Sequence, residues 1–93
     1  MFEIPNKKNV RWDKWNREHI KKHGLNPRQV EEVFTDENLI MQQTYKERAK
    51  FIGRCGKIIL SVVVSEEVKK FYIVSARIAS KEERLAYYEN EQK

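Results

Sequence analysis

Closely spaced cations mark the middle of the sequence. Between residues 46 and 57, five basic side chains face a single acid, Glu47; the bases are Lys46, Arg48, Lys50, Arg54 and Lys57. By alternation along a predicted strand, Arg48, Lys50 and Arg54 share one face, and the packing residues Ala49, Phe51 and Gly53 share the other. Such a row could bind successive phosphates, and the arginines could each donate two hydrogen bonds. The alternative is that these charges protect a sheet edge from pairing.

Arg77 closes an otherwise apolar strand. It follows Phe71, Ile73 and Ser75 on one face, just before a predicted helix. A cation at a rigid strand end suits RNA cleavage without a metal, because negative charge grows on the phosphate oxygens as the 2′-hydroxyl attacks. The alternative is a salt bridge from Arg77 to Glu82 or Glu83.

Histidine and aromatic residues supply further candidates. His19 and His23 lie four residues apart and so share a helix face, but no third metal ligand is indicated. His23 at the helix end would suit phosphate binding or proton donation, or it could cap the helix. Trp12 and Trp15 could stack on bases, although in so small a domain we expect tryptophan in the core. Of Tyr87 and Tyr88, about 100° apart on a helix, we expect one buried and one accessible.

The elements that must position these residues indicate an α+β fold. A short strand at 10–12 precedes a helix capped by Asp13 and running to His23, and a second helix starts at Asn26-Pro27 and ends near Asp36. Period-two patterns predict strands at 39–45, 48–54, 57–65 and 69–78, with 57–65 central and covered on both faces. Ser80 and Glu83 form a capping box that opens a C-terminal helix to about Gln92. We therefore expect a twisted antiparallel sheet of about four strands, with two N-terminal helices and one C-terminal helix packed on it.

Length and composition narrow the class of protein. The 93 residues predict a single domain spanning 1–93, without a membrane span or leader, and hence a cytoplasmic protein. The lone Cys55 argues against disulfide and structural zinc sites, and no nucleotide-binding loop occurs. The net charge of +5 resides in residues 1–28, which hold eight bases and three acids. A polyanion partner and an ordinary basic surface both fit this charge.

Several short motifs, taken together, resemble the BrnT family of type II toxins, and the resemblance spans nearly the whole chain. They are Trp12-Asp13, Trp15-Asn16, His19-Ile20, Lys22-His23-Gly24, Val30 to Phe34 with Asp36, Glu47-Arg48, Ser75-Ala76-Arg77, Glu83-Arg84 and Tyr87. The resemblance implies a RelE-like fold and a ribonuclease that arrests translation, and we expect this ribonuclease to cleave RNA without cofactor or metal. It also implies RNA as substrate and a BrnA-like ribbon-helix-helix antitoxin as partner, with a homodimer inside the heteromeric complex as a further expectation.

Combining these residues with the resemblance gives a set of expected roles. Arg77 would stabilise the transition-state phosphate, Arg48 and Lys50 would position the backbone, and His23, Glu47 or Tyr88 would move protons. Further RNA contacts are expected from Lys22, Lys50, Arg54 and Arg84. Two non-enzymatic alternatives stay open: an RNA-binding or protein-interaction module on the same fold, and a transcription cofactor that binds an acidic partner.

Overall fold

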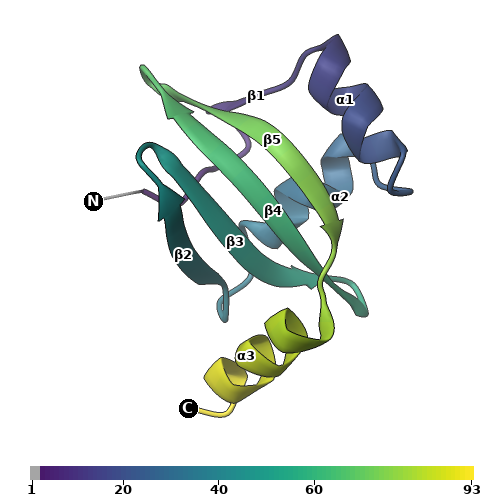
Figure 1. Ribbon diagram of the computed structural model, residues 1–93, viewed down its shortest axis with the longest axis vertical. Helices are drawn as coiled ribbons and strands as arrows, with labels where there is room; N and C mark the ends of the chain where they lie inside the picture. Colours follow the sequence, from purple (N-terminus) through teal and green to yellow (C-terminus); the bar gives the residue numbers. More distant parts are fainter. Residues whose placement is uncertain (1–2) are drawn as a thin grey trace.

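The computed structural model describes residues 3–93, so residues 1 and 2 of the predicted domain lie outside the described residues. The chain order is β1 (Val10–Arg11), α1 (Lys14–Lys21), α2 (Pro27–Val33), β2 (Ile40–Tyr45), β3 (Arg48–Cys55), β4 (Ile58–Glu67), β5 (Lys70–Ile78) and α3 (Lys81–Glu91). The strands form one sheet in the order β1-β5-β4-β3-β2, with α2 behind it and α1 next to β5 at the upper right in Figure 1, and α3 at the lower end of the other side. The α+β architecture predicted from the sequence is confirmed.

All three helices begin where their capping residues predict. Asp13, Asn26 and Ser80 each accept the backbone N–H of the residue three positions later, and that residue's side chain accepts the cap's own N–H. The two N-terminal helices end earlier than expected, at Lys21 instead of His23 and at Val33 instead of near Asp36. The physical reason is that each last turn tightens into i to i−3 hydrogen bonds, as in His23 N–H to Ile20 O at 3.0 Å.

The sheet differs from the predicted antiparallel one by the strand β1. The four long strands form the predicted meander, but β1 pairs parallel with β5, which makes the five-stranded sheet mixed. The backbone N–H of Phe71 donates to the carbonyl oxygen of Asn9 at 2.8 Å, next to this pairing. Because β3 lies between β2 and β4, its cations do not protect a sheet edge, and that alternative is wrong.

Two hydrophobic clusters lie on opposite sides of the sheet. The larger joins α1 and α2 to the sheet through residues such as Ile20, Val33, Phe51 and Leu60, and the smaller joins α3 through Ile52, Ile59, Ala79 and Tyr87. Gly53 lets α2 approach β3, since a Cβ there would lie 2.8 Å from both Val33 Cγ1 and Leu39 Cδ1.

The burial pattern confirms some expectations and overturns others. The strand β4 is central as predicted, but its second face is fully buried only near Ile59 and Ser61, because α3 covers only one end of the sheet. Tyr87 is buried and Tyr88 is 41% exposed, as expected for neighbours on a helix. Trp15 is 77% exposed, so the expectation that it packs in the core is wrong. Trp12, by contrast, packs against the larger cluster.

Candidate active site

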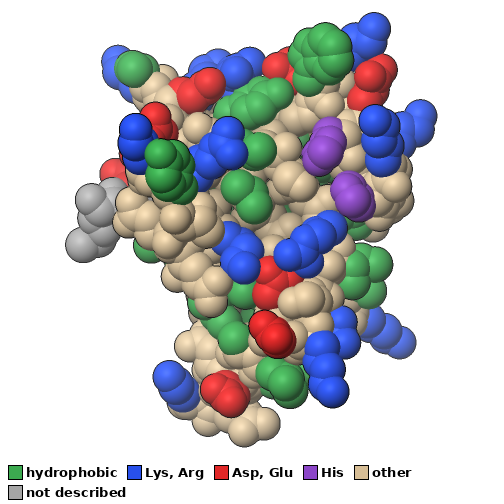
Figure 2. All heavy atoms as spheres, in the orientation of Figure 1, with side chains coloured by type: hydrophobic (Ala, Val, Ile, Leu, Met, Phe, Trp, Pro, Cys, Tyr) green, Lys and Arg blue, Asp and Glu red, His purple; other side chains and the backbone are tan. Residues whose placement is uncertain are grey.

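The side of the sheet opposite α1 and α2 is only partly covered. Beyond the end that α3 covers, the strands present the side chains of what we call the open sheet face: Arg48, Lys50, Val63, Ser65, Ser75 and Arg77. Figure 2 shows basic side chains gathered across the middle of this side, over β3 to β5, above the start of α3. The open sheet face therefore combines partly buried strand residues with several cations.

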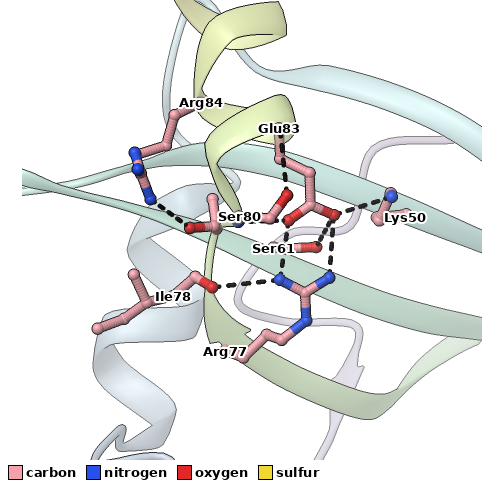
Figure 3. Close-up of polar contacts among 8 residues, drawn as sticks. Lys50, Ser61, Arg77, Ile78, Ser80, Glu83 and Arg84 are labelled. Atoms are coloured by element: carbon pink, nitrogen blue, oxygen red, sulfur yellow. Dashed lines mark hydrogen bonds and ion pairs between the residues drawn. The ribbon is translucent and has the colours of Figure 1, made fainter.

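Glu83 is the centre of a polar cluster at the border between the open sheet face and α3 (Figure 3). Its carboxylate accepts hydrogen bonds from Arg77 Nη1 at 2.8 Å, Arg77 Nη2 at 3.1 Å and Lys50 Nζ at 2.9 Å. It also accepts from Ser61 Oγ at 3.1 Å and from the backbone N–H of Ser80 at 2.8 Å. Three adjacent strands and α3 thus converge on one carboxylate.

This environment keeps Glu83 ionised. Its side chain is 8% exposed, and burial opposes the charge, but the hydrogen bonds from Arg77, Lys50 and the Ser80 backbone hold the pKa of Glu83 far below its ordinary value. A carboxylate with so low a pKa is a weak proton acceptor near neutral pH. Glu83 is therefore suited to hold Lys50 and Arg77 in place. Together these three side chains carry a net charge of +1.

Arg77 keeps one edge of its guanidinium for a ligand. Nη1 donates to Glu83 and also to the carbonyl oxygen of Ile78 at 3.2 Å, and Nη2 donates to Glu83. Among the described residues no partner is present for Nε, and the side chain of Arg77 is 44% exposed. Nε and the second hydrogen of Nη2 point the same way, so this edge can donate two parallel hydrogen bonds to a phosphate. The ion pair with Glu83, weighed above as an alternative, exists and still leaves Arg77 able to bind an anion.

Two of the predicted RNA-binding arginines are occupied elsewhere. Arg54 Nη2 pairs with Glu91 at 3.0 Å, and its guanidinium lies 5.3 Å from the centroid of the Tyr87 ring. Arg84 points to the other side of the helix start (Figure 3), where Nη1 donates to the carbonyl oxygen of Ala79 at 2.8 Å. Both arginines tie α3 to its surroundings, and neither joins the cluster around Glu83.

Arg48 and Glu47 lie toward the opposite end of β3. Arg48 is paired across the sheet with Ser65, whereas Arg77 is paired with Ser61, four residues along β4. At about 3.4 Å per residue, this spacing separates the two levels by roughly 14 Å along the strands. Glu47 is exposed in the turn before Arg48. Because β4 lies between β3 and β5, the two arginines are also about 10 Å apart across the sheet. The structure therefore places Arg48 on the same face as Arg77 but well away from it, and it does not bring Glu47 to Arg77.

The remaining predicted residues lie on the helices. Lys22 and His23 are exposed at the end of α1. The two histidines, purple in Figure 2, lie on the same side of the molecule as the open sheet face and beside β5. Tyr88 packs edge-on against Tyr87, with ring centroids 6.1 Å apart, and is not on the helix stripe that carries Glu83 and Tyr87. Of the three predicted proton carriers, His23 follows the helix that lies beside β5, the strand of Arg77, whereas Glu47 precedes β3 and Tyr88 lies on α3.

Sequence reasoning left two members of the cluster out of the site. Glu83 entered as a capping residue, as a salt-bridge alternative and as part of a motif of the resemblance, but not as a site residue, and Ser61 was not singled out. The signal for Ser61 was present: it is a polar residue inside the apolar run Ile58 to Val64, and a buried hydroxyl needs a hydrogen-bond partner.

Within residues 3–93, no helix is long and apolar enough to cross a membrane, and no group of three metal-binding side chains occurs.

Comparison with known proteins identifies the family. Residues 12–83 match the family model described as "Ribonuclease toxin, BrnT, of type II toxin-antitoxin system". The crystal structure of the ribonuclease toxin BrnT of Brucella abortus is similar, with a TM-score of 0.58 and 27% sequence identity over 77% of this chain and 96% of that chain. A comparison with curated proteins finds no match. The matched segment contains Lys50, Ser61, Arg77 and Glu83, and the chain belongs to the BrnT family of ribonuclease toxins of type II toxin-antitoxin systems.

Proposed function

We propose that this protein is a toxin that cleaves RNA without a metal ion and is neutralised by a cognate antitoxin. The observation that carries the proposal is the free edge of Arg77, held on the open sheet face by a carboxylate with five hydrogen-bond donors. Rigid placement matters because a preorganised donor stabilises transition-state charge without first having to reorganise. Membership of the BrnT family indicates the class of reaction, RNA cleavage. Arg77 and Lys50 are the cations that would stabilise the charge developing in that reaction.

In this mechanism the RNA provides its own nucleophile. The 2′-hydroxyl loses its proton and attacks the adjacent phosphorus, and the bond to the 5′-oxygen of the next nucleotide breaks as that oxygen gains a proton. Arg77 would bind the non-bridging oxygens as they gain charge, and Lys50 would add a second positive charge on the same face. His23 would carry the proton from the 2′-hydroxyl to the departing 5′-oxygen, and Arg48 and Lys22 would bind flanking phosphates. Glu83 is a positioning residue that acts through Arg77 and Lys50.

Substitution of Arg77 tests the proposed chemistry. Arg77→Lys keeps the charge but loses the planar fork, so we expect RNA cleavage in EDTA to fall by about two to three orders of magnitude, the range for loss of one oxyanion donor. Arg28→Lys is the matched control, because Arg28 is exposed on α2 behind the sheet. Cleavage by the Arg77→Lys protein at the wild-type rate, measured per folded molecule, would show that Arg77 is only a structural partner of Glu83.

Expression in cells tests the biological role. Induction of this protein alone should slow growth and degrade RNA, and coexpression of the neighbouring open reading frame should restore both. A BrnA-like antitoxin is the expected product of that frame. Normal growth at a high yield of folded wild-type protein would instead favour a non-catalytic RNA-binding module on the same fold.

A further inference from the structure

Three aromatic side chains follow one another along α1. Trp15, His19 and His23 are spaced by four residues, so they share one flank of the helix and its final turn; we call them the aromatic stripe. All three are exposed, and Trp15 is 77% exposed. The rings of His19 and His23 are 5.6 Å apart between centroids. An indole this exposed leaves a large apolar face in water, which is unusual for tryptophan.

The aromatic stripe borders the open sheet face. Asn16 and Ile20 are the buried residues of α1 and fix which side of the helix faces the core. The stripe occupies the flank next to that side, and the histidines are visible beside β5 in Figure 2. Because β5 carries Arg77 near its end, a chain bound at Arg77 could continue along the stripe without crossing to another face.

The surroundings of the stripe favour a nucleic acid over a protein. Residues 14–23 hold four bases, Lys14, Arg17, Lys21 and Lys22, against the one acid Glu18, a net charge of +3. None of these four bases forms an ion pair with another described residue. The only aliphatic residue of α1, Ile20, is fully buried, so this helix has no exposed aliphatic surface for a protein partner. Aromatic rings between cations are typical of surfaces that bind single strands.

We propose that the aromatic stripe, through Trp15 and His19, stacks on unpaired bases of the RNA that flank the phosphate bound at Arg77, with His23 at the end of the stripe next to that phosphate. The proposal rests on the proposed function and adds the substrate class, single-stranded RNA. Stacking needs free base faces, and a duplex hides them, so paired RNA would contact only the cations. Trp15 offers the largest ring and should contribute most.

Binding to RNA that cannot be cleaved tests this inference separately from catalysis. The probe is a fluorescent single strand with 2′-O-methyl groups, and a duplex of the same sequence is the comparison. We expect Trp15→Leu to weaken single-strand binding about tenfold, within the range for loss of one stacked base, and Trp15→Phe to keep affinity within about threefold of wild type. Duplex binding should be the same for all three proteins. Leu85→Ala, which removes an apolar side chain 52% exposed on α3, is the control and should bind single strands like the wild type.

Two results would overturn the inference. One is wild-type affinity of Trp15→Leu for the single strand. The other is an equal loss of affinity for single strand and duplex, which would mean that the stripe only shapes the basic surface. In the first case, loss of neutralisation by the antitoxin in the Trp15→Leu protein would show that the stripe is a protein contact instead. A wild-type protein that binds as expected but cleaves no RNA would refute the ribonuclease proposal and leave this one standing.

Discussion

Removal of the charge on Glu83 should destabilise the fold more than any other single substitution of a carboxylate on α3. Glu83→Gln keeps the size of the side chain but replaces one acceptor oxygen by an amide that faces Lys50 and Arg77. At the position of Oε2 the amide removes two hydrogen bonds from cations, those of Lys50 Nζ and Arg77 Nη2, each worth about 1.5–3 kcal/mol when well shielded, and the bond from Arg77 Nη1 to the remaining oxygen loses its charge assistance. Because Lys50 and Arg77 are 24% and 44% exposed, solvent screening reduces the total, and we expect about 3 kcal/mol.

The expected loss is large for a chain of this size. For a domain of 60–100 residues, 1 kcal/mol shifts Tm by about 4–8 °C, so Glu83→Gln should lower Tm by roughly 12–24 °C at pH 7. Thermal unfolding followed by circular dichroism measures this shift. Glu82→Gln is the matched control. Glu82 lies next to Glu83 in the same turn, but it is exposed and has no partner among the described residues, so Tm should change by less than about 4 °C.

The pH dependence gives an independent test of the same interaction. The pKa of Glu83 is lower in the folded than in the unfolded protein, so the unfolded chain binds more protons and the stabilisation is complete only above the unfolded value, about 4.3. Below that value each pH unit removes about 1.36 kcal/mol, until the folded-state pKa is reached. At pH 3 the advantage of wild type over Glu83→Gln should therefore have shrunk by about 1.8 kcal/mol. A Tm difference that stays constant from pH 7 to pH 3 would refute the argument that the charge of Glu83 stabilises the fold.

Three further substitutions test other parts of the structure. Arg48→Gln should reduce the steepness with which log RNA affinity falls against log salt concentration by about 0.7, whereas Arg54→Gln should leave this slope unchanged because Arg54 is paired with Glu91. RNA titrations at several salt concentrations measure the slope, and a change in both variants or in neither would contradict this assignment. Tyr87→Phe should cost about 1–3 kcal/mol in a denaturant titration, because the hydroxyl donates to the carboxylate of Asp36 at 2.6 Å, and a loss below about 0.5 kcal/mol would count against that contact. Gly53→Ala should lower Tm by several degrees, since the added methyl lies too close to Val33, and an unchanged Tm would show that α2 can move away from β3.

The local elements of this protein could be predicted from the sequence because they depend on neighbours. A cap such as Ser80 and its partner Glu83 are three residues apart, and the alternation of Ile58 to Val64 needs no knowledge of the rest of the chain. The family resemblance also followed from the sequence, and the match over residues 12–83 confirms it. The basic face of β3 was predicted correctly as a face, with Lys50 on it.

What only the tertiary structure decided is which of these side chains meet. Glu83 lies 33 positions from Lys50 and 22 from Ser61, and no periodicity indicates that α3 starts directly beside both of them. The same holds for β1, whose parallel pairing with β5 joins segments about 60 residues apart. Arg54 and Trp15 illustrate this. Arg54 was expected to bind RNA but is paired with Glu91 on α3, and Trp15 was expected in the core but is exposed to solvent. Local patterns determine which element forms and which face is apolar, but contacts between elements determine which charges are neutralised and which remain free to bind a ligand.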